Sequence, residues 1–146
     1  MSAAAGAGGL AAALDHKRPL LDFVGKRSSG RALLAERDRL KAALAGLGAG
    51  PGTRLLILLP NCPAALAGLL AAMELGLEIT LADPRAGEER LRQDLAAAAP
   101  ELILTADLAI VLDRLLRLDA AASAGVLVVR MAQMLPFPRS LVTPFL

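Results

Sequence analysis

Aromatic residues and residues of specialised chemistry are scarce in this chain. Its 146 residues include no Trp, no Tyr, three Phe, one Cys and one His. One cysteine excludes an intrachain disulfide and a cysteine-based zinc site. Proteins that bind nucleic acid usually carry a dense Lys/Arg stripe, often with aromatic stacking platforms. The chain has neither, and its formal net charge is only +2, so we expect no nucleic-acid partner.

Long uninterrupted hydrophobic runs are also missing. The longest, Ala64 to Leu77, contains Glu74 and is followed by Glu78. It is too short and too acidic for a membrane-spanning helix, and it predicts a buried core helix instead. The Ala/Gly tract over residues 1–14 lacks the positive start of a secretory signal, and we expect residues 1–18 to form a disordered leader. Together with the single cysteine, this favours a cytoplasmic protein.

Aliphatic residues are abundant, since 55% of the chain is hydrophobic and most of that is Ala and Leu. Over residues 31–47 the leucines share one helical stripe and the charged residues 36–39 fall mostly on the other side, which predicts an amphipathic helix. Ser28 or Ser29 is a suitable N-cap for it. Leu20–Val24, followed by Gly25-Lys26 as a turn, predicts one arm of a small hairpin.

Strands and helices alternate over the rest of the chain. Continuous apolar runs bounded by turn residues predict buried strands, and Asn61 is a plausible N-cap for the helix after the first of them. The expected strands are 54–59, 77–81, 102–105 and 126–129, and the expected helices are 63–75, 87–99 and 108–118. This order indicates an α/β fold, a partial parallel sheet with right-handed crossovers and helices on both faces. Three prolines predict a loop over residues 134–146.

The glycine-rich stretch Gly46–Gly52 is the first candidate for a phosphate site. A phosphate-binding loop follows a strand and opens a helix, so that helical N–H groups face the anion. This stretch follows a predicted helix and precedes a predicted strand. It therefore indicates a helix end and a turn.

A nucleophile–base pair of Cys62 and His16 is the second candidate. His16 lies in the expected leader beside Lys17 and Arg18, so we expect Cys62 to be a small buried side chain instead. A metal site would need carboxylates alone. Glu88, Glu89 and Asp94 are the nearest group, and their helical spacing is typical of a solvated face.

Asn61 and Asp83 follow the first two strands of the expected sheet. In open α/β sheets, ligands bind beyond the carboxyl ends of the strands, and both residues lie there. The alternative is that they serve only as cap and turn residues.

Residues 42–63 resemble the start of the AMP-forming acyl-CoA synthetases, part of the adenylate-forming superfamily. In that family a helix ends in Leu-Gly, and a Pro-Gly-Asp-Arg-like turn leads to an apolar strand ending in Pro-Asn-x-Pro. An Ala-rich helix ending in Gly follows, and then a strand ending in an Asn-Pro-like break. The counterparts here are, in order, Leu47-Gly48, Pro51 to Arg54, Pro60 to Pro63, Gly76 and Asp83-Pro84.

The similarity covers roughly residues 19–146, and residues 128–137, which end in Leu-Pro-Phe, look like the long-chain fatty-acid branch. Thr53 stands where the family often has Asp, Ser29-Gly30 where an aromatic residue is usual, and Asp83 where Asn is usual. The resemblance implies the N-terminal part of the large domain of a long-chain fatty-acid–CoA ligase. Such an enzyme joins a fatty acid to AMP and then to CoA, using ATP and Mg²⁺.

The family's phosphate loop, adenine- and ribose-binding motifs, acidic magnesium ligand and catalytic Lys have no counterpart in this sequence. We therefore predict no catalytic, cofactor-binding or metal-binding residue here, and a truncated portion that is inactive alone. The alternative is a stand-alone α/β module that associates with a partner, such as a separately encoded synthetase remainder.

Exposed apolar strand edges predict self-association, and the lipid substrates of the family leave peripheral membrane contact open.

Overall fold

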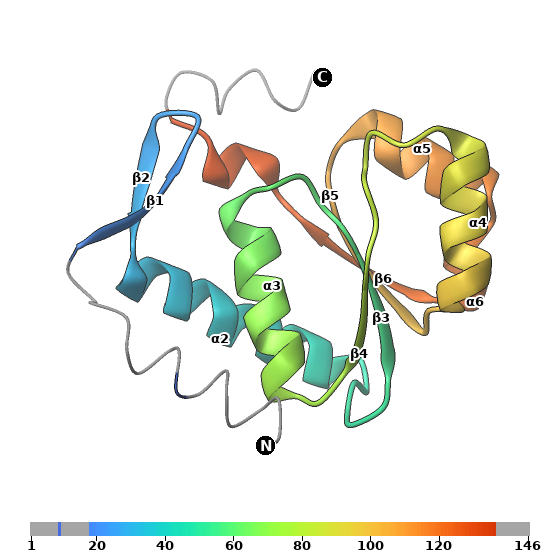
Figure 1. Ribbon diagram of the computed structural model, residues 1–146, viewed down its shortest axis with the longest axis horizontal. Coiled ribbons are helices and arrows are strands. Elements are labelled where there is room, and N and C mark those ends of the chain that lie inside the picture. Colours follow the sequence, from blue (N-terminus) through green and yellow to red (C-terminus); the bar gives the residue numbers. More distant parts are fainter. Residues whose placement is uncertain (1–8, 10–17, 137–146) are drawn as a thin grey trace.

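The computed structural model describes residue 9 and residues 18–136 (Figure 1). Apart from residues 9 and 18, the expected leader lies outside the described residues, as do residues 137–146 of the expected C-terminal loop. The elements are β1 (Pro19–Phe23), β2 (Lys26–Ser29), α2 (Gly30–Gly46), β3 (Arg54–Leu58), α3 (Pro63–Glu74), β4 (Glu78–Leu81), α4 (Glu88–Ala98), β5 (Leu102–Ala106), α5 (Ala109–Arg117), α6 (Ala120–Ser123), β6 (Gly125–Val129) and the 3₁₀ helix η1 (Met131–Met134).

Four strands form one sheet in the order β4-β3-β5-β6, and every neighbouring pair is parallel. Helices α2 and α3 pack on one face of this sheet, and α4 and α5 pack on the other (Figure 1). Strands β1 and β2 form a separate antiparallel hairpin. The predicted α/β class with a parallel sheet is confirmed, and so is the hairpin.

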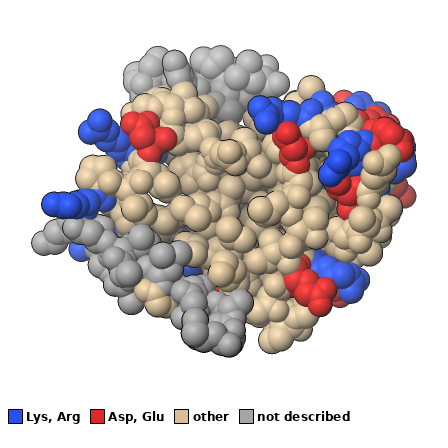
Figure 2. Space-filling model, in the orientation of Figure 1, with Lys and Arg blue, Asp and Glu red and all other residues tan. Residues whose placement is uncertain are grey.

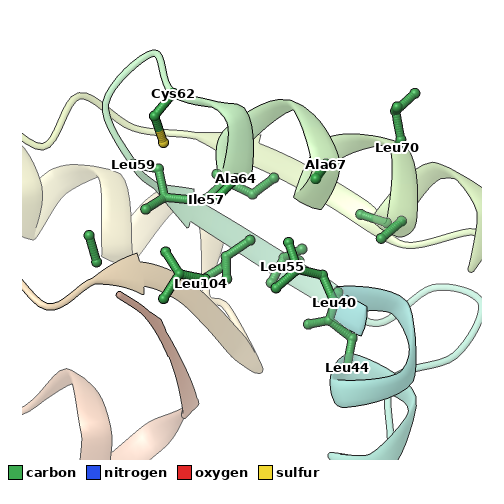
Figure 3. Close-up of a cluster of buried hydrophobic side chains, with 14 of the residues drawn as sticks. Leu40, Leu44, Leu55, Ile57, Leu59, Cys62, Ala64, Ala67, Leu70 and Leu104 are labelled. Atoms are coloured by element: carbon green, nitrogen blue, oxygen red, sulfur yellow. The ribbon is translucent and has the colours of Figure 1, made fainter. Parts of the chain in front are cut away.

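The central strand β3 supplies two hydrophobic cores, because successive side chains of a strand point to opposite faces. Leu55 and Ile57 join the core under α2 and α3, whereas Leu56 and Leu58 join the core under α4 and α5. None of the four is more than 3% exposed. Figure 3 shows the first core, in which side chains of α2 and α3 meet those of β3 and Leu104 of β5. The expectation of a strand buried on both faces is therefore correct for β3.

Strand β4 differs from the sequence-based expectation of a second buried strand. Leu81 is 65% exposed, and Ile79 and Thr80 are only half-buried. The reason is the order of the sheet, since β4 lies at its edge and, within the described part of the chain, has β3 as its one neighbour. An apolar run of this length fits a central and an edge strand equally well.

The sequence places Arg37 on the outer side of α2, but in the structure it lies at the contact between α2 and α3. Its side chain is 15% exposed, and its Nη1 donates a hydrogen bond of 2.6 Å to Oε1 of Glu74 on α3. Nζ of Lys41 donates to the other oxygen of Glu74 at 2.9 Å. Helix α3 packs along α2, so the side of α2 that carries Arg37 becomes an interface.

The N-cap predicted from the sequence is correct for α2 and wrong for α3. Oγ of Ser29 accepts a hydrogen bond of 3.2 Å from the backbone N–H of Ala32, so Ser29 is the N-cap of α2. The sequence predicts Asn61 as the cap of α3, but Cys62 occupies that position and no side chain makes a cap bond. Pro63 begins the helix, and its missing N–H removes one of the donors that a cap would satisfy.

The hairpin turn is shifted by one residue from the prediction. Val24 and Gly25 form it with φ angles of 54° and 88°, and Lys26 already belongs to β2. Oδ1 of Asp22 accepts a 2.9 Å hydrogen bond from the N–H of Gly25. Two left-handed residues suit the twist of a tight hairpin, although a β-branched residue such as Val24 is unusual there.

Candidate functional site

The carboxyl ends of β3 and β4 border a hollow of about 790 Å³. One wall is the β1–β2 hairpin, with Leu21 and Phe23, and another is the start of α3, with Leu66 and Leu69. The connection from β4 to α4 forms the third wall. The volume lies in the range of small-molecule pockets, and its place is where open α/β sheets bind ligands. The polar side chains among its lining residues are Asp22, Asn61, Asp83 and Arg85.

Asn61 and Asp83, the two residues that the sequence placed beyond the strand ends, both line this hollow. Asp83 is already engaged, because its Oδ1 accepts hydrogen bonds from the backbone N–H and the Nε of Arg85, at 2.9 and 3.2 Å. These bonds hold the pKa of the Asp83 carboxyl below its usual range. The carbonyl of Asp83 also accepts from the N–H of Ala86. Asp83 is therefore a turn residue in this structure, in line with one of the two interpretations of the sequence, and Asn61 is exposed at the rim.

Arg114 of α5 was not identified from the sequence, yet it holds one wall of the hollow in place. Its Nη1 donates to the backbone carbonyls of Pro84 and Ala86, at 3.2 and 2.6 Å. These acceptors lie 30 and 28 residues away along the chain. A bond over that separation leaves no local signal in the sequence, and only the packing of α5 beside the β4–α4 connection reveals it.

Thr105, near the end of β5, is a second residue that sequence reasoning missed. It is fully buried, and its hydroxyl donates a 3.1 Å hydrogen bond to the carbonyl of Leu58. This bond ties the ends of β3 and β5 together. A Thr in an apolar run is ordinary for a strand, so nothing in the run distinguished it.

Cys62 packs as a small buried side chain, as expected, within the core shown in Figure 3. Burial raises the pKa of its thiol, and the nearby backbone N–H groups of Ala65 and Ala64 oppose that effect only in part. A raised pKa keeps the thiol protonated and poorly nucleophilic near neutral pH. His16, the other half of the considered pair, lies outside the described residues.

The glycine-rich stretch is a helix end followed by a turn, as the sequence indicated. Gly48 and Gly52 have φ angles of 88° and 83°, in the left-handed region that glycine adopts most easily. The N–H of Ala49 returns to the carbonyl of Leu44, and the N–H of Gly52 donates to the carbonyl of Gly76. These N–H groups therefore donate to acceptors within the chain.

Glu88, Glu89 and Asp94 lie on α4 and form ion pairs with Arg92 and Arg90. The side chains of Glu88 and Glu89 are solvated as predicted, whereas that of Asp94 is only 19% exposed. Over residue 9 and residues 18–136, no group of three or more His, Cys, Asp and Glu residues is placed to hold a metal ion. In the same part of the chain, no helix has the length and apolar character needed to cross a membrane.

A second, smaller hollow of about 420 Å³ lies between β2, α2 and the segment around η1. Its lining includes the charged residues Lys26, Glu36, Arg39 and Arg130. Arg39 pairs with Glu36, and Nζ of Lys26 donates to the carbonyl of Gln133. The second of these contacts joins the hairpin to η1.

Known protein structures share this fold. A benzoate CoA ligase from Burkholderia xenovorans LB400 superimposes with a TM-score of 0.70 at 18% identity, over 89% of this chain and 26% of the ligase. ATP-bound MatB from Rhodopseudomonas palustris gives 0.72 at 21% identity, over 89% of this chain and 26% of MatB. A protein from Rhodopseudomonas palustris CGA009, provisionally named a long-chain-fatty-acid CoA ligase, gives a TM-score of 0.69 at 22% identity. The match covers 90% of this chain and 33% of that protein.

The chain thus spans about a quarter to a third of the length of these ligases. Among curated protein sequences, none matches it. The sequence profile of the AMP-binding enzymes matches residues 10–141, which is nearly the whole chain. This chain therefore belongs to the AMP-binding enzyme family, and its α/β sheet has the architecture of the adenylate-forming synthetases.

Proposed function

We propose that this chain is the N-terminal portion of an AMP-forming acid–thiol ligase whose acid is a long-chain fatty acid. The observation that supports it most is the family match over residues 10–141, combined with a fold that corresponds to only 26–33% of the matching ligases. The fatty-acid assignment rests on the Leu135-Pro136-Phe137 segment and on the likeness to the provisionally named long-chain ligase.

The reaction that this proposal implies has two steps. A fatty-acid carboxylate attacks the α-phosphate of ATP, which forms acyl-AMP and releases pyrophosphate. The thiol of CoA then takes the acyl group and releases AMP. Magnesium, when bound, would offset phosphate charge in the first step.

The residues that the structure describes do not fit ATP or Mg²⁺, so neither step is assigned to them. The glycine-rich stretch uses its N–H groups within the chain, and Asp83 is occupied by Arg85. Among the described residues, no group of three or more His, Cys, Asp and Glu side chains is placed to hold a metal ion. The role that fits this chain is that of a structural scaffold. It provides four parallel strands, a helix layer on each face of the sheet, and the hollow at the carboxyl ends of β3 and β4.

ATP–pyrophosphate exchange tests this proposal. The purified chain, given a fatty acid, ATP and Mg²⁺, is expected to show no exchange above a blank without protein. The same assay on a polypeptide that continues into the downstream coding sequence is expected to show exchange that depends on the fatty acid. Exchange by the 146 residues alone would contradict the proposal, because it would require a complete adenylation site.

A second candidate is a stand-alone α/β module that binds a partner, such as a separately encoded synthetase remainder. The favouring observation is that the sheet has a packed core on each face. The DNA downstream of the gene distinguishes the two candidates. A Gly/Ser/Thr-rich loop closed by Lys in that DNA, in any frame, supports the ligase portion, whereas an independent stop and promoter support the module.

The proposed location is the cytoplasm, where ATP and CoA are available. Peripheral contact with a membrane would bring the chain close to lipid substrates. Sedimentation with lipid vesicles tests that contact, and recovery of the chain in the supernatant at every lipid concentration would contradict it.

A further inference from the structure

The β1–β2 hairpin presents two apolar side chains to the outside. Figure 1 shows it at one end of the molecule, apart from the four-stranded sheet. Leu21 and Phe23 anchor it, because they pack against the core under α2 and α3. Leu20 and Val24, by contrast, are 42% and 47% exposed. Neither of them lines the two hollows described above, so they are separate from the candidate site.

Val24 lies at the tip of the hairpin in a conformation that disfavours valine. Its φ angle is 54°, a region where β-branched residues are outliers and where hairpin turns usually carry Gly, Asn or Asp. Folding alone would therefore favour a residue without this apolar side chain. Departures of this kind are found mainly at functional positions. An exposed valine at the tip thus indicates a role other than forming the turn.

Basic residues surround these two side chains. Residues 18–31 contain four basic residues and one acidic residue, a formal charge of +3, whereas the whole chain has +2. The positive surplus of the chain is therefore concentrated here. The four basic residues are Arg18, Lys26, Arg27 and Arg31, and the acidic residue is Asp22. Figure 2 shows Lys and Arg side chains projecting from this end, whereas basic and acidic side chains are mixed over α4 and α5.

The strand pairing places charge on the same side of the hairpin as the exposed apolar residues. Since Leu21 and Phe23 point inward, Asp22 between them points outward, and so does its cross-strand partner Arg27. Nε of Arg27 lies 3.7 Å from Oδ2 of Asp22, and the Arg27 side chain is 75% exposed. Arg31 is exposed in the first turn of α2.

An apolar tip with basic residues around it matches the chemistry of an anionic lipid surface. Apolar side chains gain free energy by leaving water at the acyl boundary, and Lys and Arg are attracted to anionic headgroups. A stable protein interface fits less well, because it involves about 20–30 residues on each side. Single-stranded nucleic acid usually stacks on exposed aromatic side chains, but the chain has no Trp or Tyr and Phe23 packs inward.

We propose that the hairpin face, defined by Leu20, Val24, Arg27 and Arg31, is a docking site for membranes that contain anionic phospholipids. Leu20 and Val24 enter the interfacial zone, and the two arginines contact headgroup phosphates. Binding is reversible, because two apolar side chains are fewer than a stable anchor requires. This inference rests on the membrane contact in the proposed function, and it adds the surface and the class of lipid.

Flotation of vesicles with the full 146-residue chain tests the proposal. Vesicles rise in a density gradient whereas self-associated protein sediments, so the two are separated. Vesicles of phosphatidylcholine mixed with phosphatidylglycerol should bind the chain at least about tenfold more strongly than phosphatidylcholine alone. High salt should weaken this binding, because ions screen the attraction between arginines and headgroups.

The absence of tryptophan provides a direct probe of insertion. Val24→Trp places a single tryptophan at the tip. Leu47→Trp is the matched control, because Leu47 is 49% exposed and lies at the end of α2 away from the hairpin. Emission from Val24→Trp should shift to the blue when anionic vesicles are added, since the indole leaves water. Emission from Leu47→Trp should stay unchanged.

Two double variants locate the electrostatic contact. One combines Arg27→Gln with Arg31→Gln, and the other combines Arg90→Gln with Arg92→Gln on α4. The first should weaken binding to anionic vesicles at least about tenfold, because each basic residue near such a surface contributes a factor of about five. The second removes the same charge from another surface and should weaken binding less than about twofold.

Val24→Asn separates membrane binding from folding. Asn adopts the left-handed conformation more readily than Val, so the midpoint of urea unfolding should rise. Vesicle binding should nevertheless fall at least about threefold, because the apolar side chain is gone. A variant that is more stable and binds equally well would contradict the role given to Val24.

Four results would overturn the proposal. The chain does not float with anionic vesicles, or it floats while the emission of Val24→Trp stays unchanged, which would place the contact elsewhere. The two double variants weaken binding equally. Emission of Val24→Trp shifts to the blue without lipid as the protein concentration rises, which would make a second copy the occupant. None of these readouts depends on catalysis, so a failure here is distinguishable from a failure in the pyrophosphate-exchange test.

Discussion

The contact between Glu74, Arg37 and Lys41 joins α2 to α3, and it makes stability depend on pH. Burial by itself raises the pKa of Glu74, but the hydrogen bond from Lys41 and the charge of Arg37 outweigh burial and leave that pKa below its ordinary value. A lowered pKa in the folded state means that the stabilisation is present above the unfolded-state value, about 4.3. It is lost as the pH falls through the folded-state value.

Replacing Glu74 by Gln tests this contact. The variant should be less stable at pH 7 by about 1–3 kcal/mol, because Arg37, 15% exposed, loses a charged acceptor. Its unfolding free energy should also fall less steeply than the parent's below about pH 4.5. Urea unfolding at low protein concentration measures both, with Glu89→Gln on the exposed side of α4 as the control. Equal pH slopes for parent and variant would contradict the assignment.

Thr105 gives a second test on a single residue. Thr105→Val keeps the shape of the side chain but removes the hydroxyl that donates to the carbonyl of Leu58. We expect a loss of about 1 kcal/mol in the free energy of unfolding, the usual net value of a buried hydrogen bond. Thr80→Val, on the half-buried edge strand, should change it less. A Thr105→Val variant as stable as the parent would show that this bond contributes nothing.

Among the elements, helix α2 depends on its N-cap because it begins directly after strand β2. Ser29→Ala removes the acceptor of the Ala32 N–H, and we expect a cost of about 1 kcal/mol in the free energy of unfolding. Ser28→Ala is the matched control, because Ser28 pairs with Leu21 in the hairpin and does not cap the helix. If the two substitutions cost the same, the cap bond is not the cause. Circular dichroism during urea unfolding measures both.

Considered as a whole, the molecule leaves apolar side chains on the outer side of α3 and on strand β4 half-buried or exposed, among them Leu66, Leu69 and Leu81. When no partner covers them, we expect the isolated chain to self-associate. Size-exclusion chromatography with light scattering should show a mass that rises with protein concentration, and Leu81→Lys should shift it toward the monomer. A sharp monomeric peak at all concentrations, with a cooperative thermal melt, would contradict the expectation.

The sequence by itself determined the local elements and which segments are apolar. The continuous apolar run over residues 54–59 predicted a buried strand, because a strand covered on both faces carries apolar side chains at successive positions. Glycine at Gly48 and Gly52 predicted a helix end and a turn, and Ser29 was one of two suitable caps. These features depend on residues that are close together along the chain, so local patterns express them.

Only the tertiary structure decided how these elements meet. The order β4-β3-β5-β6 makes β4 an edge strand, and the packing of α3 on α2 brings Glu74 to Arg37, 37 residues away. The wall of the hollow held by Arg114 has the same origin. The physical reason is that periodicity reports which side of an element is apolar, whereas the neighbour that covers that side depends on the path of the connections and on packing between distant segments.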